Sequence, residues 1–176
     1  MKIQLREERE EDLPIVKALI EKAFDGLPFS DGTEGRMVER IHKAPYFIPE
    51  LSIVAICDDQ IVGHILFTPV KIKGEHTDVT SLALAPMSVL PGYQKQGIGK
   101  ALIKEGIKVA TKLNFDSIVV LGHAEYYPKF GFRNASHYGV LCPLDVPDDY
   151  FMVLELNPGS LNDVFGMVVY PEEFFE

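Results

Sequence analysis

The residue types in this sequence that could carry out chemistry gather in two short stretches. The first, residues 94–100, contains Gln94, Gly97 and Gly99 and leads into a segment whose apolar residues have helical spacing. Glycines let the backbone approach a ligand closely, and the first turn of a helix has unpaired N–H groups that carry a partial positive charge. This stretch therefore predicts a site for an anionic group such as a phosphate.

The two best-known phosphate loops are not matched. Ile98 stands where a P-loop requires lysine, and Leu102 stands where a dinucleotide fingerprint requires glycine or alanine. The spacing that remains is Gln94-x-x-Gly97-x-Gly99. It resembles the Q/R-x-x-G-x-G/A pyrophosphate loop of the GNAT superfamily, the acetyl-CoA-dependent N-acetyltransferases, and residues 82–91 resemble the strand that precedes this loop.

The second stretch, Tyr127-Pro-Lys-Phe-Gly-Phe132, resembles the Y-x-x-x-G-F signature of the same superfamily. The resemblance implies that Tyr127 acts as the general acid that protonates the departing CoA thiolate. A phenol has a pKa of about 10, so it carries its proton at neutral pH. Pro128 either begins a short helix or holds Tyr127 extended, and Val-Leu-Gly-His stands at residues 120–123 where many members have an Asn. Tyr126 is therefore kept as the alternative acid.

The resemblance also implies where acetyl-CoA, the expected cosubstrate, would bind. Pro86 cannot donate a ladder hydrogen bond, so pairing of its strand should be interrupted there, by an ordinary bulge or by a ligand that pairs instead. In the GNAT fold the pantetheine arm pairs with this part of the strand. Lys95 and Lys100 would supply positive charge for the phosphates. The predicted cofactor-binding residues are Met87, Ser88, Val89, Gln94, Lys95, Gln96, Gly97, Ile98, Gly99 and Lys100.

The surrounding patterns predict the elements that position these residues. Helical spacing occurs in residues 13–24 and 98–113 and more weakly in residues 33–42, whereas strand patterns occur around residues 3–5 and in residues 51–57, 61–72, 79–90, 117–121, 150–156 and 164–170. A strand, a long helix and a second strand from 79 to 121 indicate a parallel strand pair. We expect an α/β (α+β mixed-sheet) fold of the GNAT type: a mostly antiparallel sheet with one splayed parallel pair and helices on both faces.

Composition limits the possible functions. The chain has 176 residues, enough for one domain spanning residues 1–176. Its net charge of −9 argues against a general binder of nucleic acid or anionic membranes. No segment has the roughly 20 apolar residues of a membrane span, and Cys57 and Cys142 lack the spacing of a disulfide framework or zinc site. We expect a cytoplasmic monomer or homodimer that uses no metal.

The resulting hypothesis is an N-acetyltransferase that transfers acetyl to a primary amine of a small molecule, peptide or protein by direct attack. Glu75, His123 and Glu125 are unranked candidates for the base that deprotonates the amine, whereas His64 is interpreted as a strand-surface or core histidine. The acidic region after Asn134 either attracts a cationic acceptor or simply keeps the surface soluble. The alternatives are a non-catalytic acyl-CoA-binding sensor or interaction module and, less favoured by the spacing, an ATP-binding domain.

Overall fold

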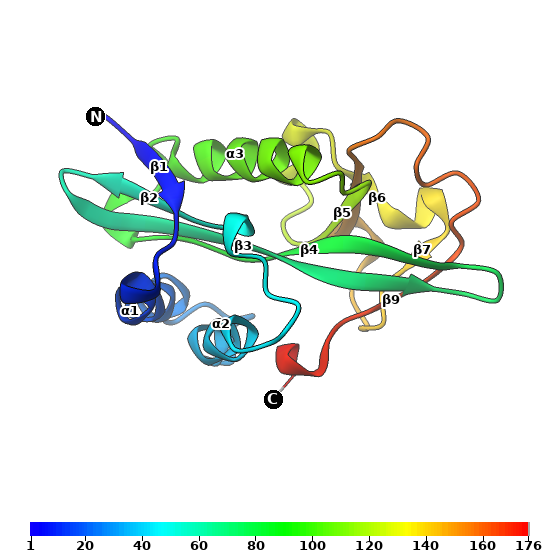
Figure 1. The fold of residues 1–176 in the computed structure, drawn as a ribbon, viewed down its shortest axis with the longest axis horizontal. Coiled ribbons are helices and arrows are strands. Elements are labelled where there is room, and N and C mark those ends of the chain that lie inside the picture. The colour runs from blue at the N-terminus through cyan, green and yellow to red at the C-terminus, as the bar shows by residue number, and fades with distance from the viewer. Residues whose placement is uncertain (176) are drawn as a thin grey trace. The chain divides into compact units, whose positions relative to one another are not determined.

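The computed structural model describes residues 1–175. Figure 1 shows the helices and strands along the chain. The helices are α1 (Leu13–Phe24), α2 (Glu34–His42) and α3 (Ile98–Lys112). The strands are β1 (Gln4–Glu7), β2 (Ser52–Cys57), β3 (Gln60–Lys73), β4 (Asp78–Val89), β5 (Ser117–Leu121), β6 (Arg133–Asn134), β7 (Val140–Leu141), β8 (Phe151–Glu155) and β9 (Gly166–Val169).

Within residues 1–175 the strands form one nine-stranded mixed sheet in the order β1-β2-β3-β4-β5-β8-β6, with β9 pairing to β3 and β7. β4 and β5 run parallel, as do β7 and β9, while β1–β2, β2–β3, β3–β9, β5–β8 and β6–β8 are antiparallel. The expected parallel pair between the strands around α3 is confirmed. The two-residue strands β6 and β7 have no pattern in the sequence that predicts them.

The chain groups into two compact units. The first comprises Met1–Phe67, Pro86–Val109 and the residues from Glu172 on, and the second comprises Thr68–Ala85 and Ala110–Pro171. β3, β4 and α3 each contribute residues to both units. A single domain over residues 1–176 stays a prediction.

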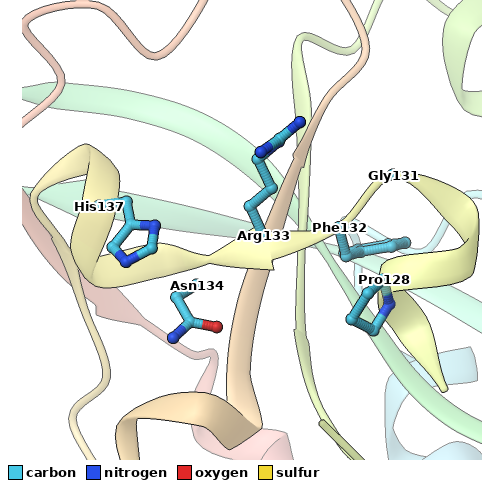
Figure 2. Close-up of a pocket in the computed structure, with 6 residues that line it drawn as sticks. All are labelled: Pro128, Gly131, Phe132, Arg133, Asn134 and His137. Atoms are coloured by element: carbon cyan, nitrogen blue, oxygen red, sulfur yellow. The ribbon is translucent and has the colours of Figure 1, made fainter. Parts of the chain in front are cut away.

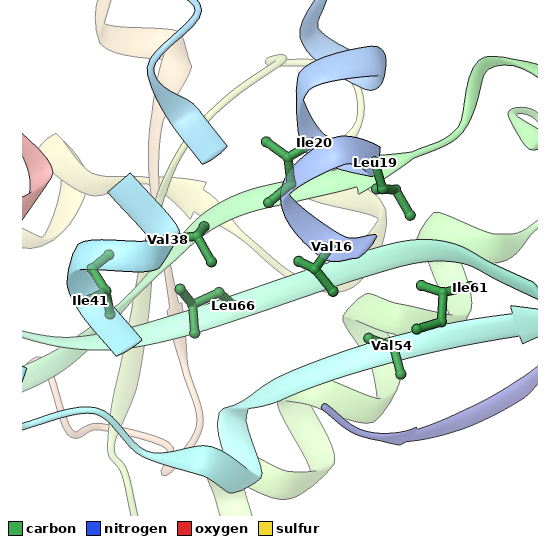
Figure 3. Close-up of a cluster of buried hydrophobic side chains, with 8 residues drawn as sticks. All are labelled: Val16, Leu19, Ile20, Val38, Ile41, Val54, Ile61 and Leu66. Carbon is green, nitrogen blue, oxygen red and sulfur yellow. The ribbon is translucent and has the colours of Figure 1, made fainter. Parts of the chain in front are cut away.

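In the first unit, α1 and α2 pack on one face of the β2–β3 hairpin (Figures 1 and 3). The apolar spacing of both helices places a stripe of side chains toward the strands. Eight buried side chains form this core: Val16, Leu19, Ile20, Val38, Ile41, Val54, Ile61 and Leu66. The cluster closes one face of the hairpin.

The opposite face of the same hairpin is covered by α3 (Figure 1). A Cβ on Gly63 would lie 2.9 Å from Cγ2 of Ile98 and 3.1 Å from Cδ1 of Leu102, and a Cβ on Gly106 would overlap the ring of Phe67. Two glycines, one on the strand and one on the helix, therefore allow α3 to lie close against the sheet. Close packing here fixes where α3 begins.

The β2–β3 hairpin contains a bulge that changes which face of the sheet the β3 side chains point to. Its turn residues Asp58 and Asp59 have φ values of 49° and 60°, the left-handed backbone of a tight hairpin turn. Ala55 pairs with Gly63 but the next residue of β2 pairs with Ile61, so Val62 is an extra residue in β3. Because of it, Ile61 faces α1 and α2 while Gly63 faces α3.

The second unit is organised around β5 and β8. All five residues of β5 pair with β8, from Ser117–Glu155 to Leu121–Phe151. On its other side β5 pairs with β4, and the buried Ser81 hydroxyl is 2.7 Å from that of Ser117 and 3.0 Å from the Ser117 carbonyl oxygen. This network fixes the start of the parallel pair.

Candidate active site

The loop between β4 and α3 is held by two side-chain amides. Nε2 of Gln94 donates a hydrogen bond to the Val89 carbonyl at 3.1 Å, and Nε2 of Gln96 donates one to the Gly92 carbonyl at 3.2 Å. A single helical turn, Pro91–Tyr93, begins the loop. The amides fold this exposed segment back onto its own backbone just before α3 starts.

Two residues of this loop have left-handed backbone. Lys95 has a φ of 62° and Gly97 a φ of 88°. This conformation costs a residue other than glycine roughly 1–2 kcal/mol. The side-chain hydrogen bonds of Gln94 and Gln96, the residues on either side of Lys95, offset this cost. The backbone angle therefore favours glycine at position 97. A Cβ on Gly97 would meet no atom within 4 Å, so the space above it is open.

The open space at Gly97 lies over the first turn of α3. The N–H of Ala101 donates to the Gly97 carbonyl at 3.0 Å. The N–H groups of the preceding residues, Ile98, Gly99 and Lys100, lie in the first turn of α3, where the helix itself provides no acceptor. The loop thus presents backbone donors and the positive end of the α3 dipole in an exposed segment.

The predicted cofactor-binding residues all lie in the first unit. Met87, Val89 and Gly99 are half-buried, Ser88 and Ile98 are buried, and Gln94, Lys95, Gln96, Gly97 and Lys100 are exposed. The pairing of β4 with β5 covers Leu82 and Ala83, whereas β4 continues to Val89. Pairing with β5 therefore stops before Pro86, as the sequence predicts.

Tyr127 lies in the second unit, at the start of a short 3-10 helix, Tyr127–Phe130. Pro128 occupies its first turn, one of the two positions predicted for it. The Tyr127 ring packs edge-on against Tyr126 at 5.3 Å and Phe132 at 5.6 Å between ring centroids. Burial, with a smaller contribution from Tyr126, raises the pKa of Tyr127 above its usual value, so the phenol keeps its proton at neutral pH.

Tyr126, the alternative acid, has a different environment. It is half-buried, its ring centroid lies 5.4 Å from that of Phe130, and Nζ of Lys129 lies 5.5 Å from the Tyr126 ring centroid. A cation at this distance is attracted by the ring face. The Tyr126 ring therefore packs between Phe130 and the Lys129 ammonium.

Two pockets occur in the second unit. One of about 490 Å³ is lined by His123, Ala124, Glu125, Tyr126, Lys129 and Tyr150. It contains two of the candidate bases, both exposed, whereas the third, Glu75, is 90% exposed in the β3–β4 turn. The second pocket, of about 390 Å³, has Pro128 and Phe132 at one end and Asn134 and His137 at the other (Figure 2). Neither pocket is lined by Tyr127 or a predicted cofactor-binding residue.

Part of the acidic C-terminal region has structural partners. Nδ2 of Asn134 donates to Asp149 at 2.9 Å and to Asp148 at 3.3 Å, and the Ser136 hydroxyl donates to Asp148 at 2.9 Å. These carboxylates fix the segment that precedes β8. Attraction of a cationic acceptor by this region stays a prediction.

The first unit also contains a buried polar cluster that the sequence analysis missed. One carboxylate oxygen of Glu8, Oε2, accepts a hydrogen bond from the Ser52 hydroxyl and lies 3.1 Å from Nε2 of both His42 and His64. Burial by itself would raise the pKa of Glu8, but the hydrogen bonds from His42, His64 and Ser52 outweigh it and hold the pKa well below its usual value. The His64 side chain is 0% exposed, so of the two positions that the sequence analysis gives it, the strand surface and the core, it occupies the core.

The comparisons with known proteins agree with this geometry. Residues 49–134 match the family described as acetyltransferase (GNAT) domain. The chain is 31% identical over 164 residues to the uncharacterized N-acetyltransferase YhbS of Escherichia coli K12, covering 93% of each chain. The E. coli YhbS crystal structure in complex with CoA superposes with a TM-score of 0.89 at 28% identity, over 100% of this chain and 93% of that one. A GNAT family acetyltransferase from Brucella melitensis, in complex with acetyl-CoA, gives a TM-score of 0.82 at 32% identity over 98% of both chains.

A mixed sheet in which β4 and β5 run parallel, and a glycine loop before a central helix, thus define an acyltransferase of known type. The chain belongs to the GNAT family of N-acetyltransferases. Among residues 1–175, no helix has the length and apolar character to cross a bilayer.

Proposed function

We propose that this protein binds acetyl-CoA and transfers its acetyl group to a primary amine by direct attack, with Tyr127 as the general acid. The observation that carries the proposal is the left-handed Gly97, with open space above it, at the start of α3. The E. coli and B. melitensis relatives, whose structures contain CoA and acetyl-CoA, support the choice of ligand.

The cofactor site follows from the loop geometry. The pyrophosphate would accept hydrogen bonds from the N–H groups at the start of α3, with Lys95 and Lys100 as exposed counter-charges. The backbone of Met87 to Val89, beyond the end of the β4–β5 pairing, would receive the pantetheine and the acetyl carbonyl. A backbone N–H near Val89 would then stabilise the oxyanion of the tetrahedral intermediate.

Tyr127 would supply the proton that the leaving thiolate requires. Its raised pKa keeps the phenol protonated, and its packing restricts the ring to one position. When the C–S bond breaks, the sulfur takes the phenolic proton and the tyrosinate is reprotonated from solvent. The acceptor is a primary amine, which must lose a proton before it can attack.

Ligand binding is tested by thermal shift with acetyl-CoA, CoA and ATP on the wild type and on Gly97→Glu. A ligand that binds only the folded state raises its stability by RT ln(1 + [L]/Kd). Acetyl-CoA and CoA should raise the midpoint of the wild type but not of the variant, because a glutamate would occupy the open space and repel the phosphates. A shift with ATP alone would contradict the proposed site.

Catalysis is tested by acetylation of a panel of primary amines: small aliphatic amines, polyamines, amino acids and lysine-containing peptides. Tyr127→Phe should lower kcat by about 10²–10⁴-fold and leave the Kd of acetyl-CoA unchanged, whereas the matched variant Tyr126→Phe should keep wild-type rates. Acetyl-CoA binding with no transfer to any amine would favour a non-catalytic acyl-CoA-binding module instead.

A further inference from the structure

His64, at the centre of the buried cluster, has one ring nitrogen bound and one unpaired. Nε2 lies 3.1 Å from Oε2 of Glu8 and 3.0 Å from the Ser52 hydroxyl. Nδ1 is buried and has no hydrogen-bond partner among residues 1–175. A buried ring nitrogen without a partner is uncommon in a folded protein and requires an explanation.

The partners of Nε2 determine which form of the imidazole is present. An ionised carboxylate can only accept hydrogen bonds, so Nε2 carries a hydrogen and donates it to Glu8. In a neutral imidazole with this arrangement, Nδ1 holds the lone pair. Glu8 therefore orients His64 with its basic nitrogen directed away from the carboxylate.

Ser88 is a second buried polar group without a partner. Its hydroxyl is buried, and no residue from 1 to 175 forms a hydrogen bond with it. Ser88 lies in the middle of Met87–Val89, the backbone segment to which the acetyl carbonyl is assigned above. Its side chain is thus next to the proposed position of the reacting carbon.

A hydrogen bond between β3 and β4 relates the positions of these two groups. The Leu90 N–H donates a hydrogen bond to the Val62 carbonyl at 2.9 Å, which joins the end of β4 to β3. Moving two residues along each strand from this bond leads to Ser88 and His64. In an antiparallel ladder such residues stand opposite one another on the same face, with Cβ atoms about 4.5–5.5 Å apart.

From this arrangement we propose that His64 is the general base of the acetyl transfer and that the Ser88 hydroxyl orients the acceptor nitrogen, directly or through one water. The inference rests on the proposed function. In the step, an N–H bond of the acceptor ammonium breaks, its electron pair stays on nitrogen, and the proton forms a new N–H bond at Nδ1 of His64. The free amine then attacks the thioester carbon, and its nitrogen loses a second proton to solvent as the C–S bond breaks and the amide forms. The imidazolium releases its proton to solvent after the transfer.

Titratable groups lie on the Nε2 side of His64. They are Glu8, in contact with Nε2, and His42, which lies 3.1 Å from the same carboxylate oxygen and is 14% exposed. The nearby charges of Arg6 and Asp12 pair with each other at 2.6 Å. No three His, Cys, Asp or Glu side chains within residues 1–175 are arranged to hold a metal ion.

The first test compares His64→Gln with His76→Gln, a matched change at a histidine that is 90% exposed. With an amine that the wild type acetylates, His64→Gln should lower kcat by about 10²–10⁴-fold at pH 7. Its Kd for acetyl-CoA, measured by thermal shift, should be unchanged. The deficit should narrow as pH rises toward the pKa of the amine, because an amine that is already neutral needs no base. His76→Gln should match the wild type throughout.

A second variant and an NMR measurement on the wild type test the assignment even if His64→Gln does not fold. Ser88→Ala removes a hydroxyl that makes no hydrogen bond with residues 1–175, so the protein should fold, and it should show the same kcat deficit in milder form. In long-range ¹H–¹⁵N NMR spectra of the wild type at pH 7, the His64 ring, identified by its absence from His64→Gln, should carry its hydrogen on Nε2. A hydrogen on Nδ1 would overturn the assignment of the base.

The outcomes separate the two proposals. A wild type that transfers acetyl to no amine contradicts the proposed function, and the assignment of His64 falls with it. A wild type that acetylates amines while His64→Gln or Ser88→Ala does so at an unchanged rate overturns only the assignment of these residues. A kcat deficit in His64→Gln that persists unchanged at high pH also overturns it, because the defect is then not one of proton removal.

Discussion

Gly122 lies against the ring of Tyr127, so closely that a Cβ at position 122 would overlap Cε2 of the ring. The last pair of β5 and β8 and a hydrogen bond from the Gly122 N–H to the Tyr150 carbonyl, at 2.9 Å, fix the backbone at this point. The position of the Tyr127 ring therefore requires glycine at residue 122, five residues earlier in the chain.

Gly122→Ala should displace the Tyr127 ring. Overpacking of this kind costs about 1–3 kcal/mol, and kcat should fall while the Kd of acetyl-CoA stays the same. Urea denaturation and amine acetylation measure the two effects. In a double-mutant cycle with Tyr127→Ala, the stability cost of Gly122→Ala should largely disappear, because the ring that it meets is gone. Full additivity would show that the alanine acts elsewhere.

Gly63→Ala should weaken acetyl-CoA binding, because its Cβ would press on Ile98 and Leu102 in the first turns of α3. The matched variant is Gly106→Ala, whose Cβ would meet Phe67 further along the same helix. Both variants should be less stable than the wild type by about 1–3 kcal/mol. We expect only Gly63→Ala to raise the Kd measured by thermal shift, and an equal rise in both would contradict the assignment of the ligand to the helix start.

Glu8 should make the stability of the protein sensitive to acid. Its folded-state pKa lies well below the unfolded value of about 4.3. Stability from the ionised carboxylate is therefore present above about pH 4.3 and is lost as the pH falls toward the folded-state pKa. Glu8→Gln should cost about 1–3 kcal/mol at pH 7 and should flatten the fall in urea midpoint between pH 6 and pH 3. The neighbouring exposed Glu7, changed to Gln, should behave like the wild type.

Tyr127 should not limit activity on the alkaline side. Because burial raises its pKa above the usual value of about 10, the phenol stays protonated up to pH 10, and kcat should not decline from pH 7 to pH 10 through loss of this acid. Ultraviolet titration of tyrosinate, comparing the wild type with Tyr127→Phe, checks the cause. A tyrosine that ionises below pH 10 in the wild type and is missing from the variant would contradict this prediction.

Much of the fold could be predicted because its signals are local. The helical spacing of the α3 residues, the alternation and β-branched runs of the strands, and Asp58-Asp59 between two apolar runs each report on backbone conformation within a few residues. The Gln94-x-x-Gly97-x-Gly99 loop is local in the same sense, since a strand, a glycine turn and a helix start follow one another directly in the chain.

The polar cluster could not be predicted for the opposite reason. Glu8, His42, Ser52 and His64 come from four separate elements or their flanking residues, and only tertiary packing brings their side chains to one carboxylate oxygen. In the sequence, Glu8 is one charge in the run Arg6 to Asp12 and cannot be distinguished from its solvated neighbours. The left-handed backbone of Lys95 could not be predicted either, because it depends on the side-chain hydrogen bonds of Gln94 and Gln96 and not on the residue type of Lys95.

The extra residue Val62 also determines how this protein should be compared with its relatives. Strand residues alternate between the two faces, so a relative that lacks the inserted residue would present the residue aligned with Ile61 to α3 instead of to α1 and α2. Two sequences could then share an apolar residue in the same alignment column and yet place it on opposite faces of the hairpin. Equivalence at this position is therefore judged by counting residues from the bulge, and the residue type alone does not establish it.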